Sequence, residues 1–187
     1  MATVSTLMTT EELLALPENG TDRWLIAGEL REIPMTVRNR FHGRLTIRVG
    51  TLLEVWRETQ PVPRGQVVGG ETGVILRHDP DTTVGVDVAY ISAEVMARQT
   101  ASSTLIDGIP TLIVEILSPS DTVRNVNEKI DVYMAVKVPI VWIIDPHRQN
   151  VTVYQPGKPA QLFNIGDELT AEPHLPGFRV QVAQIFD

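Results

Sequence analysis

Two strongly apolar stretches of the chain, 83–91 and 111–117, each carry a single carboxylate where an apolar side chain would be expected. The acids are Asp87 and Glu115. Near-continuous apolar runs rich in valine and isoleucine are typical of central strands that are covered on both faces. An ionised carboxylate is costly to bury in such a strand unless it is paired, hydrogen-bonded or bound to a metal ion. The two acids therefore predict a buried polar site within a sheet.

The alternation of side chains along a strand predicts which face of the sheet each acid occupies. Asp87 shares its face with Ala89 and Ile91, and Glu115 shares its face with Ile113. If the two strands are neighbours, the carboxylates can converge on one divalent cation. Hard oxygen donors with room for water suit Mg²⁺ or Mn²⁺.

A lysine follows on the next helix. Lys129 lies one turn after Val126 and one turn before Tyr133, so its stem is expected on or near the packed face. There the ammonium group could hold an attacking hydroxide or offset charge in the transition state. Two acids and a lysine are the minimum set for metal-assisted phosphodiester hydrolysis. A structural interpretation remains open, in which Asp87 satisfies a loop, Glu115 pairs with an arginine and Lys129 extends to solvent.

The order of predicted elements indicates the fold class. We expect a capped helix at 9–16, a hairpin at 24–35, a helix at 40–59, strands at 66–76, 83–91 and 111–117, a helix at about 125–136, a strand at 140–144, and short strands near 149–154 and 163. Asn125 and Glu128 predict a capping box at the start of the second long helix. This order predicts an α/β sandwich with a mixed central sheet. It excludes a doubly wound fold, because no helix is expected between the three middle strands.

The first long helix carries a basic stripe. Arg40, Arg44 and Arg48 recur at every fourth residue and so share one side of the helix. The stripe could bind nucleic-acid phosphates, or it could be an ordinary solvated face. His42 lies at the edge of the apolar face, three residues before Leu45, and is either a packed, hydrogen-bonded histidine or a site residue.

Composition limits the classes of function. The 187 residues suit one domain, 1–187. A net charge of −7 argues against non-specific coating of nucleic acid, which needs many Lys and Arg residues. The absence of cysteine excludes disulfides and thiolate metal sites. No apolar run reaches the roughly 20 residues of a membrane span, and residues 1–8 lack the pattern of a signal peptide, so we expect a cytoplasmic protein without a membrane partner.

Several motifs occur together in a characteristic order. They are "TTEELLAL" at 9–16, "LIAGEL" at 25–30, "VDVAY" at 86–90, "LIVEILSPS" at 112–120, "EKIDVY" at 128–133 and "VWIIDP" at 141–146. With this set the chain resembles the Uma2-type restriction endonucleases, which are members of the PD-(D/E)XK nuclease superfamily. The resemblance covers nearly the whole length, and the "VEILSPS" segment is its most specific part.

The resemblance implies a restriction-endonuclease-like core at about 40–146, with an N-terminal helix and hairpin and short C-terminal strands. It assigns Asp87 and Glu115 as ligands of Mg²⁺ or Mn²⁺. The usual lysine position of the superfamily, two residues after the glutamate, is occupied by Leu117. Lys129 matches the position to which this family moves the lysine, and Glu29 matches a further acid.

Three functional hypotheses follow. The first is a metal-dependent endonuclease that hydrolyses DNA, expected as a homodimer because cutting both strands generally needs two active sites. The second is a non-catalytic nucleic-acid-binding or interaction module on the same fold. The third is a metal phosphohydrolase with a small substrate.

Overall fold

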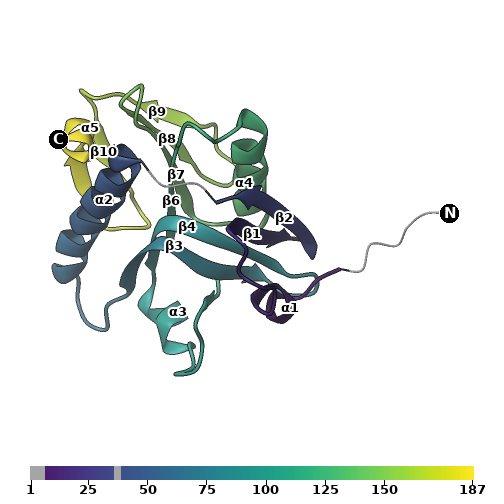
Figure 1. Ribbon diagram of the computed structural model, residues 1–187. Coiled ribbons are helices and arrows are strands. Elements are labelled where there is room, and N and C mark those ends of the chain that lie inside the picture. The colour runs from purple at the N-terminus through teal and green to yellow at the C-terminus, as the bar shows by residue number, and fades with distance from the viewer. Residues whose placement is uncertain (1–6, 36–38) are drawn as a thin grey trace.

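The computed structural model describes residues 7–35 and 39–187 (Figure 1). Its helices are α1 (Thr10–Leu14), α2 (Arg40–Glu58), α3 (Ala93–Ala97), α4 (Val123–Ala135) and α5 (Val182–Phe186). Its strands are β1 (Thr21–Ile26), β2 (Glu29–Pro34), β3 (Gln66–Arg77), β4 (Thr82–Ile91), β5 (Ile106–Asp107), β6 (Leu112–Ile116), β7 (Ile140–Asp145), β8 (Asn150–Tyr154), β9 (Gln161–Phe163), β10 (Glu168–Thr170) and β11 (Arg179–Gln181).

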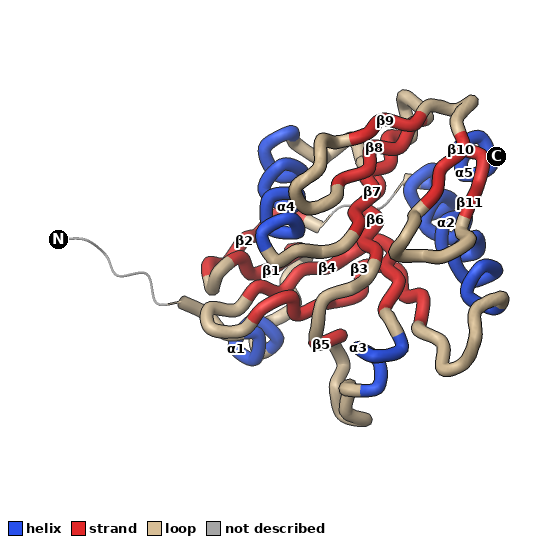
Figure 2. Tube along the Cα trace, turned by 180° about the vertical axis from the view of Figure 1, so that it is seen from behind, coloured by secondary structure: helices blue, strands red, loops and turns tan. Residues whose placement is uncertain are grey.

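One mixed sheet organises the described part of the chain. Its main path runs β2-β1-β4-β6-β7-β8-β9, and β3 pairs with β4 and β5. β6 and β7 are parallel, whereas β4 is antiparallel to β1, β3 and β6. Helix α2 covers one face of the sheet and α4 the other, as the opposite views of Figures 1 and 2 show. The predicted α/β class with a mixed central sheet is confirmed.

The connection between β4 and β6 differs from the prediction, because it contains the short helix α3 and the short strand β5. Antiparallel neighbours need no crossover helix, so α3 does not turn the fold into a doubly wound one. None of the helices in the described ranges is both long and apolar enough to cross a membrane.

Side-chain alternation on β6 separates the two cores. Leu112, Val114 and Ile116 pack with α2, and Ile113 packs with α4. Glu115 follows the phase of Ile113 and therefore points to the α4 side. Each apolar side chain fully buried in such a layer contributes about 1.5–3 kcal/mol. A slip of one residue would turn Glu115 into the apolar layer that packs with α2, so the cost of burying an unpaired carboxylate there fixes the orientation of the acid.

Caps place the two helices that carry site residues. The Asn39 side chain accepts hydrogen bonds from the backbone N–H groups of Phe41 and His42, which sets the first turn of α2. Helix α4 begins two residues earlier than predicted, because the Thr122 side chain is its N-cap and accepts from the Asn125 N–H. The capping box predicted at Asn125 is therefore wrong.

Candidate active site

Asp87 and Glu115 lie side by side on adjacent strands. The antiparallel register pairs Val88 with Val114, and the next step along both strands places Asp87 opposite Glu115. The β4–β6 pairing ends at Val88. At the next position the Asp87 side chain bonds to β6, because its Oδ2 atom accepts a hydrogen bond of 2.7 Å from the Ile116 N–H. The two acids therefore converge, as the sequence predicts for neighbouring strands.

Asp87 is held by groups from both layers. Its Oδ1 atom lies 3.0 Å from Nε2 of His42, and its side chain is 6% exposed. Burial raises the pKa of Asp87, but His42, the Ile116 N–H and the charge of Lys129 outweigh burial and lower the pKa below its ordinary value. Asp87 is therefore ionised at neutral pH.

Helix α4 presents two partners to Glu115, because residues four apart share a helix face. Lys129 Nζ lies 2.9 Å from Oε2, and the Tyr133 hydroxyl donates a hydrogen bond to Oε1. Burial raises the pKa of Glu115 to about 7, and the Asp87 charge adds to that effect, although Lys129 and Tyr133 oppose it. Glu115 thus titrates near neutral pH in the metal-free protein.

Lys129 carries a positive charge at this site. Burial lowers the pKa of Lys129, but the carboxylates of Glu115 and Asp87 raise it above its ordinary value. Its side chain remains 26% exposed. The ammonium group is therefore fixed at the acids, on a side chain that lines the cavity.

A cavity of about 270 Å³ opens at these residues. His42, Asp87, Glu115 and Lys129 all line it, so the structure brings four of the predicted residues together. The other lining residues belong to the β1–β2 hairpin, to β3, to β4, to β6 and the segment after it, to α4 and to β7: Thr21, Asp22, Arg23, Trp24, Ile33, Glu71, Gly85, Ile116, Leu117, Ser118, Asp121, Asn125, Val126 and Ile143.

Strand order explains why the cavity lies there. One edge of β4 pairs with β1 at Thr83, opposite Leu25, and with β6 from Val88 onwards. Between these points Gly85 and Asp87 face the cavity. The site therefore occupies the gap where β1 and β6 diverge along β4.

Sequence reasoning missed two site residues. Tyr133 was predicted only as a packing neighbour of Lys129. Glu71 lies in a β-bulge, where β3 shifts register between Gly69 and Thr72 and the φ angle of Glu71 is 62°. A glycine pair inside a strand was the available signal for a bulge, which can redirect a side chain.

Gly85 accommodates the bulged acid. A Cβ atom at Gly85 would lie 3.0 Å from Glu71 Oε2, so the missing side chain leaves room for the Glu71 carboxylate. Glu71 thereby adds a further negative charge to the lining of the cavity.

Glu29 does not lie at the cavity, contrary to the prediction of a further site acid. It pairs with Ile26 beside the tight turn of the hairpin, whereas the cavity is lined by the other end of the hairpin. The Glu29 side chain is 57% exposed, and its Oε2 atom lies 3.0 Å from Arg31 Nη1. The edge position of β2 thus turns this acid to solvent.

The predicted basic stripe packs largely against the C-terminal helix. Arg44 donates a hydrogen bond to the backbone oxygen of Asp187, and Arg48 donates one of 2.6 Å to the backbone oxygen of Gln184. The Arg40 guanidinium lies over the ring of its neighbour Phe41. None of the three arginines lines the cavity, and their binding of nucleic acid stays a prediction.

Side chains at the cavity offer oxygen donors for a divalent cation. Among the residues that the structure describes, no three His, Cys, Asp or Glu side chains are grouped to hold a metal ion. Asp87 and Glu115 supply two hard oxygen donors, and an ionised carboxylate has lone pairs beyond those used here. Mg²⁺ is usually bound through one or two carboxylates together with water and substrate phosphates. The residues therefore fit such an ion.

Comparisons with known proteins identify the fold and the family of the chain. A crystal structure of a putative nuclease belonging to DUF820 from Anabaena variabilis superposes with a TM-score of 0.77, covering 96% of this chain and 97% of that one at 19% identity. At that identity the likeness shows the fold, and it confirms the predicted one. No curated protein matches the chain. The family model of Uma2, described as putative restriction endonuclease, matches residues 10–183. The chain therefore belongs to the Uma2 family of putative restriction endonucleases.

Proposed function

We propose that the protein is a divalent-metal-dependent endonuclease that hydrolyses DNA phosphodiester bonds. The observation that carries the proposal is the convergence of Asp87, Glu115 and Lys129, from β4, β6 and α4, in one cavity. Membership of a nuclease family supports the reaction class. The fold alone would not, because one fold hosts many functions.

The charge of the cavity supports metal dependence. Its lining holds two permanent cations, Arg23 and Lys129. The same lining holds five carboxyl side chains: Asp22, Glu71, Asp87, Glu115 and Asp121. A phosphodiester is repelled from such a surface unless a cation offsets the excess negative charge. Asp87 and Glu115 would hold Mg²⁺ or Mn²⁺. When bound, the ion would polarise the scissile phosphate and acidify a water molecule.

Hydrogen-bonding neighbours orient the Asp87 and Glu115 carboxylates for metal binding. His42 and the Ile116 N–H occupy one oxygen each of Asp87, which fixes the carboxylate plane and keeps the acid ionised. Tyr133 fixes Glu115 through Oε1 and leaves Oε2 on the side of Lys129. Hydrogen-bonded supports of this kind orient ligating carboxylates.

Lys129 acts on the substrate phosphate. Its ammonium group is held beside Glu115 and is exposed to the cavity, so it can approach a non-bridging oxygen. A fixed positive charge there stabilises the negative charge that develops during hydrolysis. The carboxylates keep the lysine protonated throughout.

Nicking of supercoiled plasmid DNA tests the proposal. Wild-type protein is expected to nick with Mg²⁺ or Mn²⁺ and to stop when a chelator is added. Asp87→Asn, Glu115→Gln and Lys129→Met are each expected to lower the rate at least about 100-fold. Glu54→Gln, which changes an acid of α2 outside the cavity, is the control and should cut at the wild-type rate. Wild-type protein that cuts no nucleic acid with either ion would contradict the proposal.

A further inference from the structure

We propose that the outer face of α2 binds the same face of a second copy of this chain, in an antiparallel arrangement about a twofold axis. The interface would be built on one row of side chains. Gly43, Ile47, Thr51 and Val55 recur at every fourth residue, so they form a single row along the helix, which we call the α2 ridge. None of these four residues is charged, and all four are exposed.

The α2 ridge is apolar for a surface that faces water. Ile47 is 73% exposed and Val55 is 64% exposed. The outward face of a helix in a globular protein normally carries charged and polar residues. In Figures 1 and 2 the helix lies at the outer edge of the molecule in both views. Within the described part of the chain, the ridge therefore lacks a covering element.

A groove runs beside the α2 ridge. It has a volume of about 410 Å³ and lies between α2 and the start of β3, where Gly50, Val67 and Val68 are among its lining residues. A Cβ atom at Gly50 would meet no atom within 4 Å, so the helix leaves room there for an approaching side chain. Two copies can share a projecting side chain and a hollow on one face, because a twofold axis places each Ile47 against the groove of the partner.

The charges of α2 are divided between its two ends. Arg40 and Arg44 lie near the start of the helix, and Glu54 and Glu58 lie near its end. The helix dipole disfavours a cation in the first turn and an acid in the last turn, by about 0.3–1 kcal/mol each. Arg57 offsets part of this cost at the end of the helix. Stability of the helix alone therefore does not explain the distribution.

An antiparallel second copy of α2 makes the ridge complementary to itself when the two helices cross at Val49. Ile47 then lies opposite the partner's Thr51, and Gly43 lies opposite the partner's Val55. A glycine opposite each valine lets the helices approach closely. Antiparallel helices that cross at about 20° pack in this way, with their axes roughly 8–10 Å apart.

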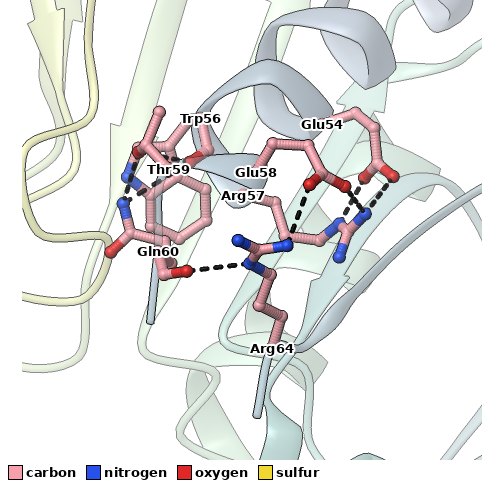
Figure 3. Close-up of polar contacts among 7 residues, drawn as sticks. All are labelled: Glu54, Trp56, Arg57, Glu58, Thr59, Gln60 and Arg64. Atoms are coloured by element: carbon pink, nitrogen blue, oxygen red, sulfur yellow. Dashed lines mark hydrogen bonds and ion pairs between the residues drawn. The ribbon is translucent and has the colours of Figure 1, made fainter. Parts of the chain in front are cut away.

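The same register brings opposite charges together. Arg40 lies opposite the partner's Glu58, and Arg44 lies opposite the partner's Glu54. Arg57 contacts both carboxylates within one chain and holds them at the surface (Figure 3). The acid side chains are still 47% and 57% exposed, so each can accept a second arginine. Parallel helices would instead place arginine beside arginine and acid beside acid, which selects the antiparallel orientation.

The proposed interface is small and separate from the cavity. Interfaces that bury less than about 1,200 Å² in total belong to weak complexes, so we expect a dissociation constant on the order of 1–10 μM. None of the ridge residues lines the cavity at Asp87 and Glu115. Each copy in the dimer therefore keeps its own complete cavity.

Sedimentation equilibrium of the purified chain from about 1 to about 100 μM tests the association. The measured mass is expected to rise from that of one chain toward that of two. Ile47→Asp places a charge in the centre of the interface, so the dissociation constant should rise at least about 100-fold. Val123→Asp is the control, because this valine of α4 is 78% exposed but lies outside the ridge. A wild-type chain that stays monomeric throughout this range would overturn the proposal, as would a dimer that Ile47→Asp leaves intact.

Two charge reversals test the register. Arg40→Glu and Glu58→Arg each place like charges opposite one another, so each variant alone is expected to dimerise about 10-fold more weakly than wild type. In a heterodimer of the two variants, both positions again pair an acid with an arginine. An equimolar mixture should therefore associate nearly as well as wild type, and circular dichroism checks that both variants are folded.

A mixture that associates no better than either variant alone would overturn the antiparallel arrangement. Sedimentation needs neither metal nor DNA, so its outcome is separate from that of the cleavage assay.

Discussion

The Nε2 atom of His42 lies 3.0 Å from the Oδ1 atom of Asp87, and both side chains are buried. His42 belongs to α2, which packs on one face of the sheet, whereas Lys129 reaches the same site from α4 on the other face. The acids lie where the β4–β6 ladder ends, so groups from both layers can approach them. The site is thus assembled across the sheet.

This relationship makes His42 a positioning residue for Asp87. Replacing His42 with Ala leaves a buried carboxylate with one partner fewer, so we expect a loss of about 1–3 kcal/mol in the free energy of unfolding. Affinity for Mn²⁺ should fall about 10- to 100-fold because the carboxylate is less well oriented. Urea denaturation and calorimetric titration measure the two effects. His147→Ala, at an exposed position, is the control; equal behaviour of the two variants would contradict the assignment.

Tyr133 should support Glu115 in a similar way. Tyr133→Phe removes the donor to Oε1 and keeps the buried ring, so the free energy of unfolding is expected to fall by about 1–3 kcal/mol. Loss of the donor also raises the pKa of Glu115 further, because the hydrogen bond favours the ionised form. Tyr154→Phe, at a half-buried position on β8, serves as the control in thermal and urea unfolding. If Tyr133→Phe left the free energy of unfolding unchanged, the hydroxyl contact with Glu115 would have no role in stability.

The raised pKa of Glu115 predicts a pH dependence of stability. Between the ordinary value of 4.5 and the folded value of about 7, the folded protein binds more protons at this group than the unfolded chain does. Stability of the metal-free protein should therefore fall as pH rises through this window, by up to about 3 kcal/mol from this group alone. Urea unfolding from pH 4.5 to pH 7.5, roughly the window of that shift, measures the slope. Glu115→Gln should flatten it, and an identical slope in that variant would assign the effect to other groups.

The bulge at Glu71 can be tested through its neighbour. Gly85→Ala places a methyl carbon 3.0 Å from the Oε2 atom of Glu71, so the carboxylate must shift slightly. Because Glu71 can rotate, we expect a stability change below about 1 kcal/mol but a measurable change in the metal dependence of cleavage. Gly50→Ala is the control, since its added Cβ meets no atom. A Gly85→Ala protein with unaltered metal titration would place Glu71 outside the chemistry.

Local sequence patterns were sufficient to predict the strands and the side of the sheet to which their acids point. A slip of one residue in 111–117 would turn Glu115 into the apolar layer under α2, so the cost of burying an unpaired carboxylate fixes its side. The spacing of Lys129 and Tyr133 places both on one face of α4. Both features depend on residues close together in the sequence.

Contacts between distant elements were not predictable in the same way. His42 meets Asp87 because α2 packs beside the end of a ladder, and Arg48 is engaged because α5 returns to α2. Periodicity gives the side on which a residue lies but not the element that will cover that side. Glu29 shows the converse error, because a motif position does not reveal that the edge of a hairpin turns the acid to solvent.

Anomalous diffraction from crystals soaked in Mn²⁺ tests the central claim most directly. We predict one strong peak within coordinating distance of carboxylate oxygens of both Asp87 and Glu115, and the loss of this peak in Asp87→Asn. Coordinates with manganese bound elsewhere and these two carboxylates still closed on His42 and Lys129 would contradict it.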